Sequence, residues 1–166
     1  MIRKLKSREK TSGDGFTIIE VLIVLAIAGL ILLIVFLAVP ALERNARNTE
    51  RKNDVSSILS AISEYESNND GQLPTTSGNF STEFSGENPK LGYYTTAANV
   101  YYNYSATTLT TVPANPGSPD KVEIYNGVEC DATNDAPSLS GASARSVIAL
   151  YDIETSGNTA EQCVSS

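Results

Sequence analysis

The first pattern along the chain is an uninterrupted apolar run. Residues 21–42 contain no charged side chain, and Glu20 is the last charged residue before them. At 1.5 Å per residue this run makes about 33 Å of helix, enough for a hydrocarbon core about 30 Å thick. We therefore expect it to cross a membrane once. Pro40 lies near the end of the run and lacks a backbone donor, so it predicts a kink in the helix.

After Pro40 the pattern becomes amphipathic. Apolar side chains recur at helical spacing and form one stripe, made of Val55, Ile58, Leu59, Ile62 and Tyr65. Residues 68–71 read Asn-Asn-Asp-Gly, which is a strong signal for the end of a helix. The pattern predicts one long, kinked helix from Phe16 to about Ser67, about 78 Å long at the same rise. Its second half needs a sheet to cover the apolar stripe.

Beyond residue 71 the chain is rich in Gly, Pro, Ser, Thr and Asn and contains short strand patterns. Four segments are candidate strands, namely residues 91–95, 100–105, 121–125 and 145–153. The last has apolar side chains on both faces, which predicts a central strand. We expect an antiparallel sheet of three or four strands on the amphipathic helix, and hence an α+β fold.

Charge is distributed unevenly along the chain. Residues 1–15 carry five basic and two acidic groups, whereas residues 53–166 carry three basic and fourteen acidic groups, a net charge of −11. The basic flank favours a cytoplasmic N-terminus. The acidic part lacks the phosphate-neutralising surface that nucleic-acid binding requires, so no direct nucleic-acid binding is expected.

A mixed-charge stretch follows the apolar run. Arg44, Arg47 and Arg51 are interleaved with Glu50. We interpret them as a solvated helix face with pairs three residues apart, such as Arg47 with Glu50. Pairing with acids of neighbouring subunits is the alternative.

The junction before the apolar run carries the most specific motif. A basic leader ends at Gly15, Phe16 follows, and Glu20 is the fifth residue after Gly15. This arrangement resembles the type IV prepilin signal, a class III signal. The resemblance implies that a prepilin peptidase cuts between Gly15 and Phe16 and N-methylates Phe16. Asp14 departs from the family pattern, which more often has a basic or small polar residue there.

Glu20 has a physical role in this interpretation. A lone carboxylate in an apolar helix bundle needs a partner. The resemblance implies that the new α-amino group of Phe16 in a neighbouring subunit supplies it. Such a pair would set the axial register of subunits more than add strength. The alternative is a Glu20 side chain at headgroup level that reaches water.

The resemblance also implies a domain organisation and a fold. Residues 1–15 are a leader removed on maturation, residues 16–42 a transmembrane and filament-core helix, residues 43–70 its amphipathic continuation, and residues 71–166 an extracellular β-rich domain. The expected fold is type IV pilin-like: a long N-terminal helix packed on a small antiparallel sheet.

The two cysteines lie in the part expected outside the cell. Cys130 and Cys163 are predicted to pair, since disulfides persist there, and pilins have a similar bridge near the C-terminus. The loop length corresponds to roughly 3–4 kcal/mol in the chain-entropy model. Two free thiols are the alternative.

Candidate metal and cofactor chemistry is sparse. The chain has no histidine, and two cysteines without histidine argue against structural zinc. Residues 131–135 place oxygen side chains at alternate positions, like a fragment of a calcium loop. They lack the glycine and the distal glutamate of a full loop, so we interpret them as a capped turn. No metal and no cofactor are expected.

The expected function is that of a structural subunit of a type IV pilus. The precursor would sit in the cytoplasmic membrane with its N-terminus inside, and the mature chain would form a homo-oligomeric surface filament. The implied partners are prepilin peptidase/methyltransferase, an assembly platform and minor pilins. The alternatives are a pseudopilin of a type II secretion system, a minor pilin, or a binding module on an uncleaved anchor. No enzyme motif is present, so an enzyme is not expected.

Overall fold

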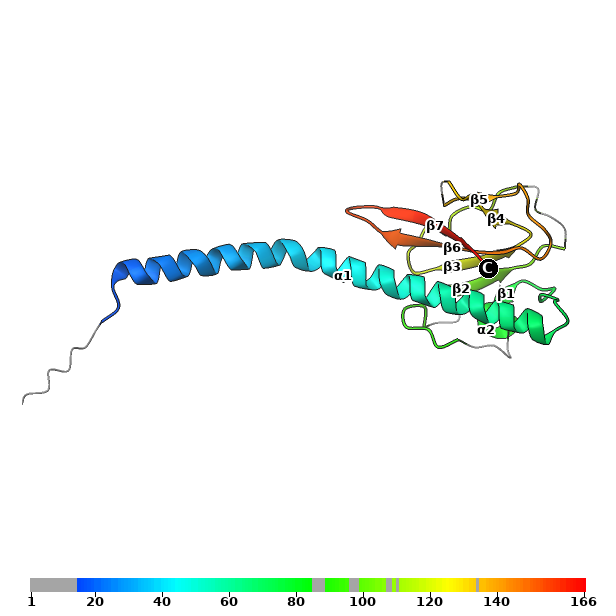
Figure 1. The fold of residues 1–166 in the computed structure, drawn as a ribbon, viewed down its shortest axis with the longest axis horizontal. Coiled ribbons are helices and arrows are strands. Elements are labelled where there is room, and N and C mark those ends of the chain that lie inside the picture. Colours follow the sequence, from blue (N-terminus) through cyan, green and yellow to red (C-terminus); the bar gives the residue numbers. More distant parts are fainter. Residues whose placement is uncertain (1–14, 85–88, 96–98, 107–108, 110, 134) are drawn as a thin grey trace, which may run out of the picture. The chain divides into compact units, whose positions relative to one another are not determined.

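The structure is a computed structural model that describes residues 15–84, 89–95, 99–106, 109, 111–133 and 135–166. The chain divides into two compact units, Met1–Pro40 and Ala41–Ser166. Helix α1, Ile18–Asn68, begins in the first unit and ends in the second (Figure 1). By length and composition it is able to cross a membrane once, and residues 15–40 are exposed in the isolated chain. This fits an apolar run that needs lipid or other helices around it.

The second half of α1 buries the predicted stripe. Val55, Ile58, Leu59 and Ile62 lie in the core, and Tyr65 packs against it. The helix ends where the sequence indicates: Asp70 and Gly71 have positive φ angles of 55° and 74°. The Gly71 N–H donates to the carbonyl of Glu66 at 2.7 Å, which closes the last turn.

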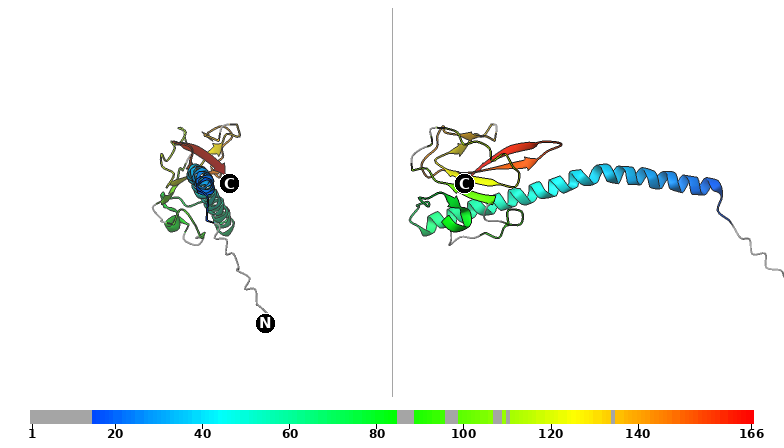
Figure 2. Two further views of the ribbon diagram at one scale, coloured as in Figure 1. Left: turned by 90° about the vertical axis from the view of Figure 1, so that its left-hand side faces the viewer. Right: turned by 180° about the vertical axis from the view of Figure 1, so that it is seen from behind.

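The second unit contains a five-stranded sheet in the order β1-β2-β3-β6-β7. The elements are β1 (Gly78–Asn79), α2 (Phe80–Glu83), β2 (Val100–Asn103), β3 (Val122–Asn126), β4 (Glu129–Cys130), β5 (Pro137–Ser138), β6 (Val147–Glu154) and β7 (Thr159–Ser165). Strands β4 and β5 form a separate pair. Figures 1 and 2 show the C-terminal half of α1 lying along the main sheet. The α+β fold class with a long N-terminal helix is therefore confirmed.

The sheet differs in detail from the expected one. It has five strands, and it is mixed because β2 and β3 run parallel, with Val100 opposite Val122. Parallel strands need a long crossover, which the polar segment between them provides. Such a segment was visible in the sequence, but it carries no signal for the direction in which the chain returns.

Three of the four predicted strands are present as β2, β3 and β6, and β6 has a neighbouring strand on each side, as expected for a central strand. The predicted strand at residues 91–95 is wrong. The backbone N–H groups of Gly92, Tyr93 and Tyr94 donate to the Asp54 carboxylate instead of to a strand. The sequence also missed β7, an edge strand whose polar composition hides it.

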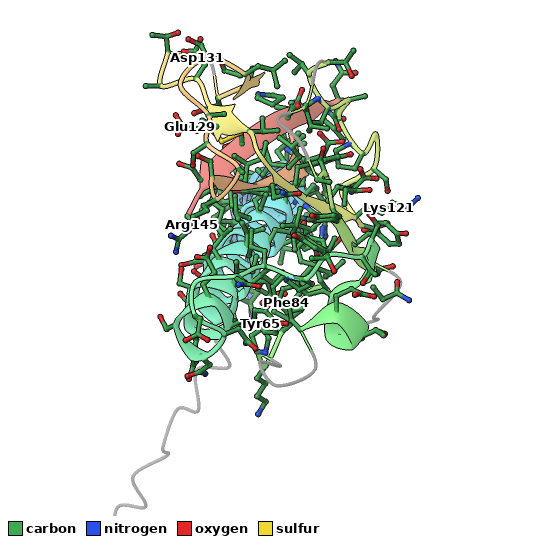
Figure 3. The ribbon with its side chains drawn as sticks, turned by 90° about the vertical axis from the view of Figure 1, so that its right-hand side faces the viewer. Tyr65, Phe84, Lys121, Glu129, Asp131 and Arg145 are labelled. Atoms are coloured by element: carbon green, nitrogen blue, oxygen red, sulfur yellow. A yellow bond between two sulfur atoms is a disulfide. The ribbon has the colours of Figure 1, made fainter. Side chains whose placement is uncertain are left out.

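The core lies on both faces of β6. Val147, Ala149 and Tyr151 face α1, whereas Ile148 and Leu150 pack on the other face with Cys163. On the α1 side, aromatic rings join α1, α2 and β2. Figure 3 shows the Tyr65 and Phe84 side chains close together, and their ring centroids are 5.0 Å apart.

Candidate functional site

The predicted processing junction, Gly15-Phe16, is exposed. A Cβ added at Gly15 would meet no atom of the described residues within 4 Å, its two chain neighbours aside, and Phe16 is 89 % exposed. Helix α1 begins two residues later, at Ile18. The backbone at Gly15 and Phe16 is therefore outside the helix, the state in which a peptidase can accept an extended chain.

Thr17 and Glu20 form a reciprocal cap at the start of α1. The Thr17 backbone N–H and hydroxyl both donate to Glu20 Oε2 at 2.8 Å, and the Glu20 N–H donates to Thr17 Oγ1 at 3.3 Å. This arrangement is a capping box, which satisfies helix N–H groups that otherwise lack partners. The sequence analysis missed it, although the Thr-x-x-Glu spacing was a usable signal.

Pro40 lies inside α1, and helical residues continue on both sides of it. The first unit ends at this residue. The missing N–H at Pro40 removes one hydrogen bond from the helix ladder. The predicted kink at Pro40 stays a prediction.

Four residues form a helix–hairpin clamp between α1 and the end of β6: Arg47, Asn48, Arg51 and Glu154. Arg51 is 0 % exposed and donates to Glu154 Oε1 at 2.6 Å. Arg47 Nε donates to the same oxygen at 3.0 Å, and Arg47 pairs with Oε2 as well. Asn48 bonds both the N–H and the carbonyl of Glu154, at 2.9 and 2.8 Å.

The clamp corrects the sequence interpretation of this stretch. Arg47 and Arg51 do not form a solvated face paired with Glu50, because their partner is Glu154, more than 100 residues away in the chain. The hydrogen bonds from Arg47, and then those from Arg51, lower the pKa of Glu154 from 4.5 to about 2. Glu154 therefore stays ionised throughout the physiological range.

Tyrosines near residue 93 serve the core more than the surface. The hydroxyl of Tyr93 accepts a hydrogen bond from Arg51 and donates to Asp120 at 2.6 Å, and the Arg51 guanidinium lies 4.2 Å from the Tyr93 ring centroid. Tyr94 and Tyr102 are buried. Tyr101 remains exposed.

Cys130 and Cys163, the predicted pair, are joined by a disulfide with a Cα–Cα distance of 5.6 Å. It connects β4 to β7. Nearby, Asp131 accepts hydrogen bonds from the Thr133 N–H and hydroxyl at 2.8 and 2.6 Å, and these lower the pKa of Asp131. Asn134, a member of the possible calcium loop, lies outside the described residues. In the described part of the chain no three His, Cys, Asp or Glu residues cluster as a metal site would need.

Comparison with known families adds independent evidence at the junction. The model of the prokaryotic N-terminal methylation motif matches residues 14–36. The chain carries a type IV prepilin-like class III signal. Comparison with curated proteins and with solved structures found no significant match.

The motif supports the assignment of this chain to the type IV pilin and pseudopilin family, and it indicates a structural protein. It implies processing by prepilin peptidase and polymerisation into a filament. The apolar start of α1, which overlaps the motif, fits a membrane-anchored precursor. The match covers the start of α1, so it carries no information about the acidic second unit.

Proposed function

We propose that this protein is a structural subunit of a type IV pilus. The observation that carries the proposal is the methylation motif at residues 14–36, which joins an exposed Gly15-Phe16 bond to a helix able to cross a membrane. The precursor waits in the cytoplasmic membrane with its N-terminus inside. Cleavage after Gly15 and methylation of Phe16 then release it for assembly into a surface filament, with an assembly platform and minor pilins as partners.

We propose that Glu20 selects the register of assembly. Among the described residues its Oε2 bonds Thr17 alone, at the start of its own helix. A carboxylate surrounded by apolar helices is costly unless it is paired. The Phe16 amine of an adjoining subunit offers a positive charge at one axial offset. The capping box keeps the carboxylate at the helix start, where that amine would arrive.

The domain limits and Pro40 belong to the same proposal. Residues 16–42 serve as the filament-core helix, residues 43–70 as the amphipathic continuation, and residues 71–166 as the extracellular domain. Pro40 lets the helix bend or locally melt when it leaves the membrane, because one ladder bond is already missing there. Adhesion, motility or DNA uptake would then depend on the filament's partners.

A pseudopilin of a type II secretion system, or a minor pilin, is the second candidate, because the same motif directs processing in both groups. Mass spectrometry of the N-terminus in two fractions, protein sheared from intact cells and protein kept in the membrane, separates the pilus subunit from the pseudopilin.

Sheared protein that begins with N-methylated Phe16 supports the pilus subunit. Processed protein found only in the membrane fraction favours the pseudopilin. A chain that still begins at Met1 overturns the proposal and leaves an anchored binding module.

A further inference from the structure

The β6–β7 hairpin has one carboxylate that is paired with cations and another that is buried without one among the described residues. Glu154, at the end of β6, is neutralised by Arg47 and Arg51 in the helix–hairpin clamp. Two residues earlier, Asp152 is 0 % exposed and makes no ion pair with a described residue. A buried carboxylate without a compensating charge is expensive and normally acquires a proton or a cation.

Asp152 is also incompletely hydrogen-bonded. Its Oδ1 accepts a hydrogen bond from Asn115 Nδ2 at 2.7 Å. Its Oδ2 is buried and has no partner among the described residues. A buried polar atom without a hydrogen-bond partner costs free energy. We therefore look for a group, such as a proton or a cation, that binds Oδ2 reversibly.

The residue directly opposite Asp152 is another acid. Asp152 pairs with Glu161 across β6 and β7, and directly opposed residues project from the same face of a sheet. Glu161 is partly buried, and burial, then the charge of Asp152, raise its pKa above the usual 4.5. Two like charges directly opposite each other destabilise the pair of strands.

The other charged groups near this face do not compensate the pair. Lys121 lies one position before β3 begins, in line with Asp152 by the β3–β6 register, but it is exposed and forms no ion pair among the described residues. Glu123 in β3 adds negative charge and accepts a hydrogen bond from Tyr125. Asp120, in the preceding loop, accepts from Tyr93.

We propose that Asp152 and Glu161 share one proton and act as an acid-responsive latch between β6 and β7. A proton from solvent adds to the Glu161 carboxylate and creates an O–H that donates to Asp152 Oδ2. The charge of the pair falls from −2 to −1, and the buried oxygen gains its missing partner. A proton suits the site better than a cation, since Oδ2 is shielded from solvent and no third acidic ligand joins it among the described residues.

The latch acts in a defined pH window. Because the folded-state pKa of Glu161 is raised, its stabilising contribution is complete below about 4.5 and is lost as pH rises through the folded-state value. The clamp at Glu154 titrates near 2, well below this window. The clamp at Glu154 and the Asp152–Glu161 pair, two positions apart along β6, therefore respond to different pH ranges.

The test uses the full chain purified in detergent, with thermal unfolding followed from pH 4.5 to pH 8. Glu161→Gln replaces the acid by a neutral amide that donates to Oδ2 at every pH. We expect its melting temperature at pH 7.5 to rise by about 3–5 °C and the gap from the wild type to close toward pH 4.5. Glu64→Gln, at an exposed position of α1, is the matched control and should follow the wild-type curve.

A second measurement keeps the proposal testable if a variant folds poorly. The ¹³C carboxyl shift of Glu161 in the wild type should titrate above pH 4.5, and in Asp152→Asn it should move back toward 4.5. A Glu161→Gln curve parallel to that of the wild type overturns the latch. So does stabilisation of the wild type, and not of Asp152→Asn, by millimolar calcium or magnesium chloride at pH 7.5, since that result assigns a cation to the pair.

Discussion

Glu20 and Glu154 are two carboxylates that contact the same helix, one in each unit, and they obtain their partners in different ways. Glu20 bonds Thr17, three residues away, within a local capping box. Glu154 bonds Arg47 and Arg51 across more than 100 residues of chain. In the first unit the partner of the carboxylate can thus be found from the local sequence. In the second unit the partners come together only after folding. The comparison teaches that a motif search can find the first kind of site and is blind to the second.

The largest expected effect is at the processing junction. Replacing Gly15 by Leu should leave almost all of the chain at precursor length, because a bulky side chain next to the cut blocks the peptidase. Immunoblots and N-terminal mass spectrometry of whole cells measure this. Gly13→Leu, two residues upstream, is the matched control and should mature. Normal maturation of Gly15→Leu would remove the cleavage assignment.

The next effect separates assembly from capping at Glu20. Glu20→Ala should be processed but yield few or no filaments in sheared fractions, because it removes the charge that we propose sets the register. Thr17→Ala removes the cap and keeps the carboxylate, so it should retain most filaments. Glu43→Gln, an exposed acid later in α1, serves as the control. Abundant fibres from Glu20→Ala would show that register does not depend on this residue.

The second unit should be most sensitive at Arg51. Arg51→Met leaves Glu154 with one arginine and removes the bond to Tyr93, so we expect a loss of roughly 2–4 kcal/mol in the free energy of unfolding. Urea unfolding of the full chain in detergent measures it. Lys52→Met changes the neighbouring exposed base and should cost far less. Equal losses in the two variants would contradict the clamp.

The smallest effect is the acid dependence of the clamp. The folded-state pKa of Glu154 is lowered to about 2, so its contribution is complete above about 4.5 and is lost as pH falls toward 2. Glu154→Gln should flatten this part of the curve of stability against pH and leave the slope above pH 5 unchanged. Thermal unfolding between pH 2 and pH 7 tests it. If Glu154→Gln loses as much stability as the wild type below pH 4.5, then other carboxylates determine the loss of stability in acid.

The spacing of apolar residues predicted helices and strands well where burial of one face determined the sequence pattern. The stripe from Val55 to Ile62 and the alternating β6 were found because burial imposes a regular spacing on apolar residues. The pattern failed at residues 91–95, where apolar and aromatic side chains lie on a loop fastened by Asp54. It also failed at β7, since an edge strand needs few apolar residues.

The sequence by itself determined the methylation motif, the apolar span, the class of fold and the pairing partners of the two cysteines. These features depend on neighbours in the chain, on composition, or on the only two thiols present. The tertiary structure alone decided the parallel β2–β3 pair, the clamp at Glu154 and the burial of Asp152 Oδ2 without a hydrogen-bond partner among the described residues. Each of these requires residues far apart in sequence to meet, and the free energy of a charge is set by what surrounds it after folding.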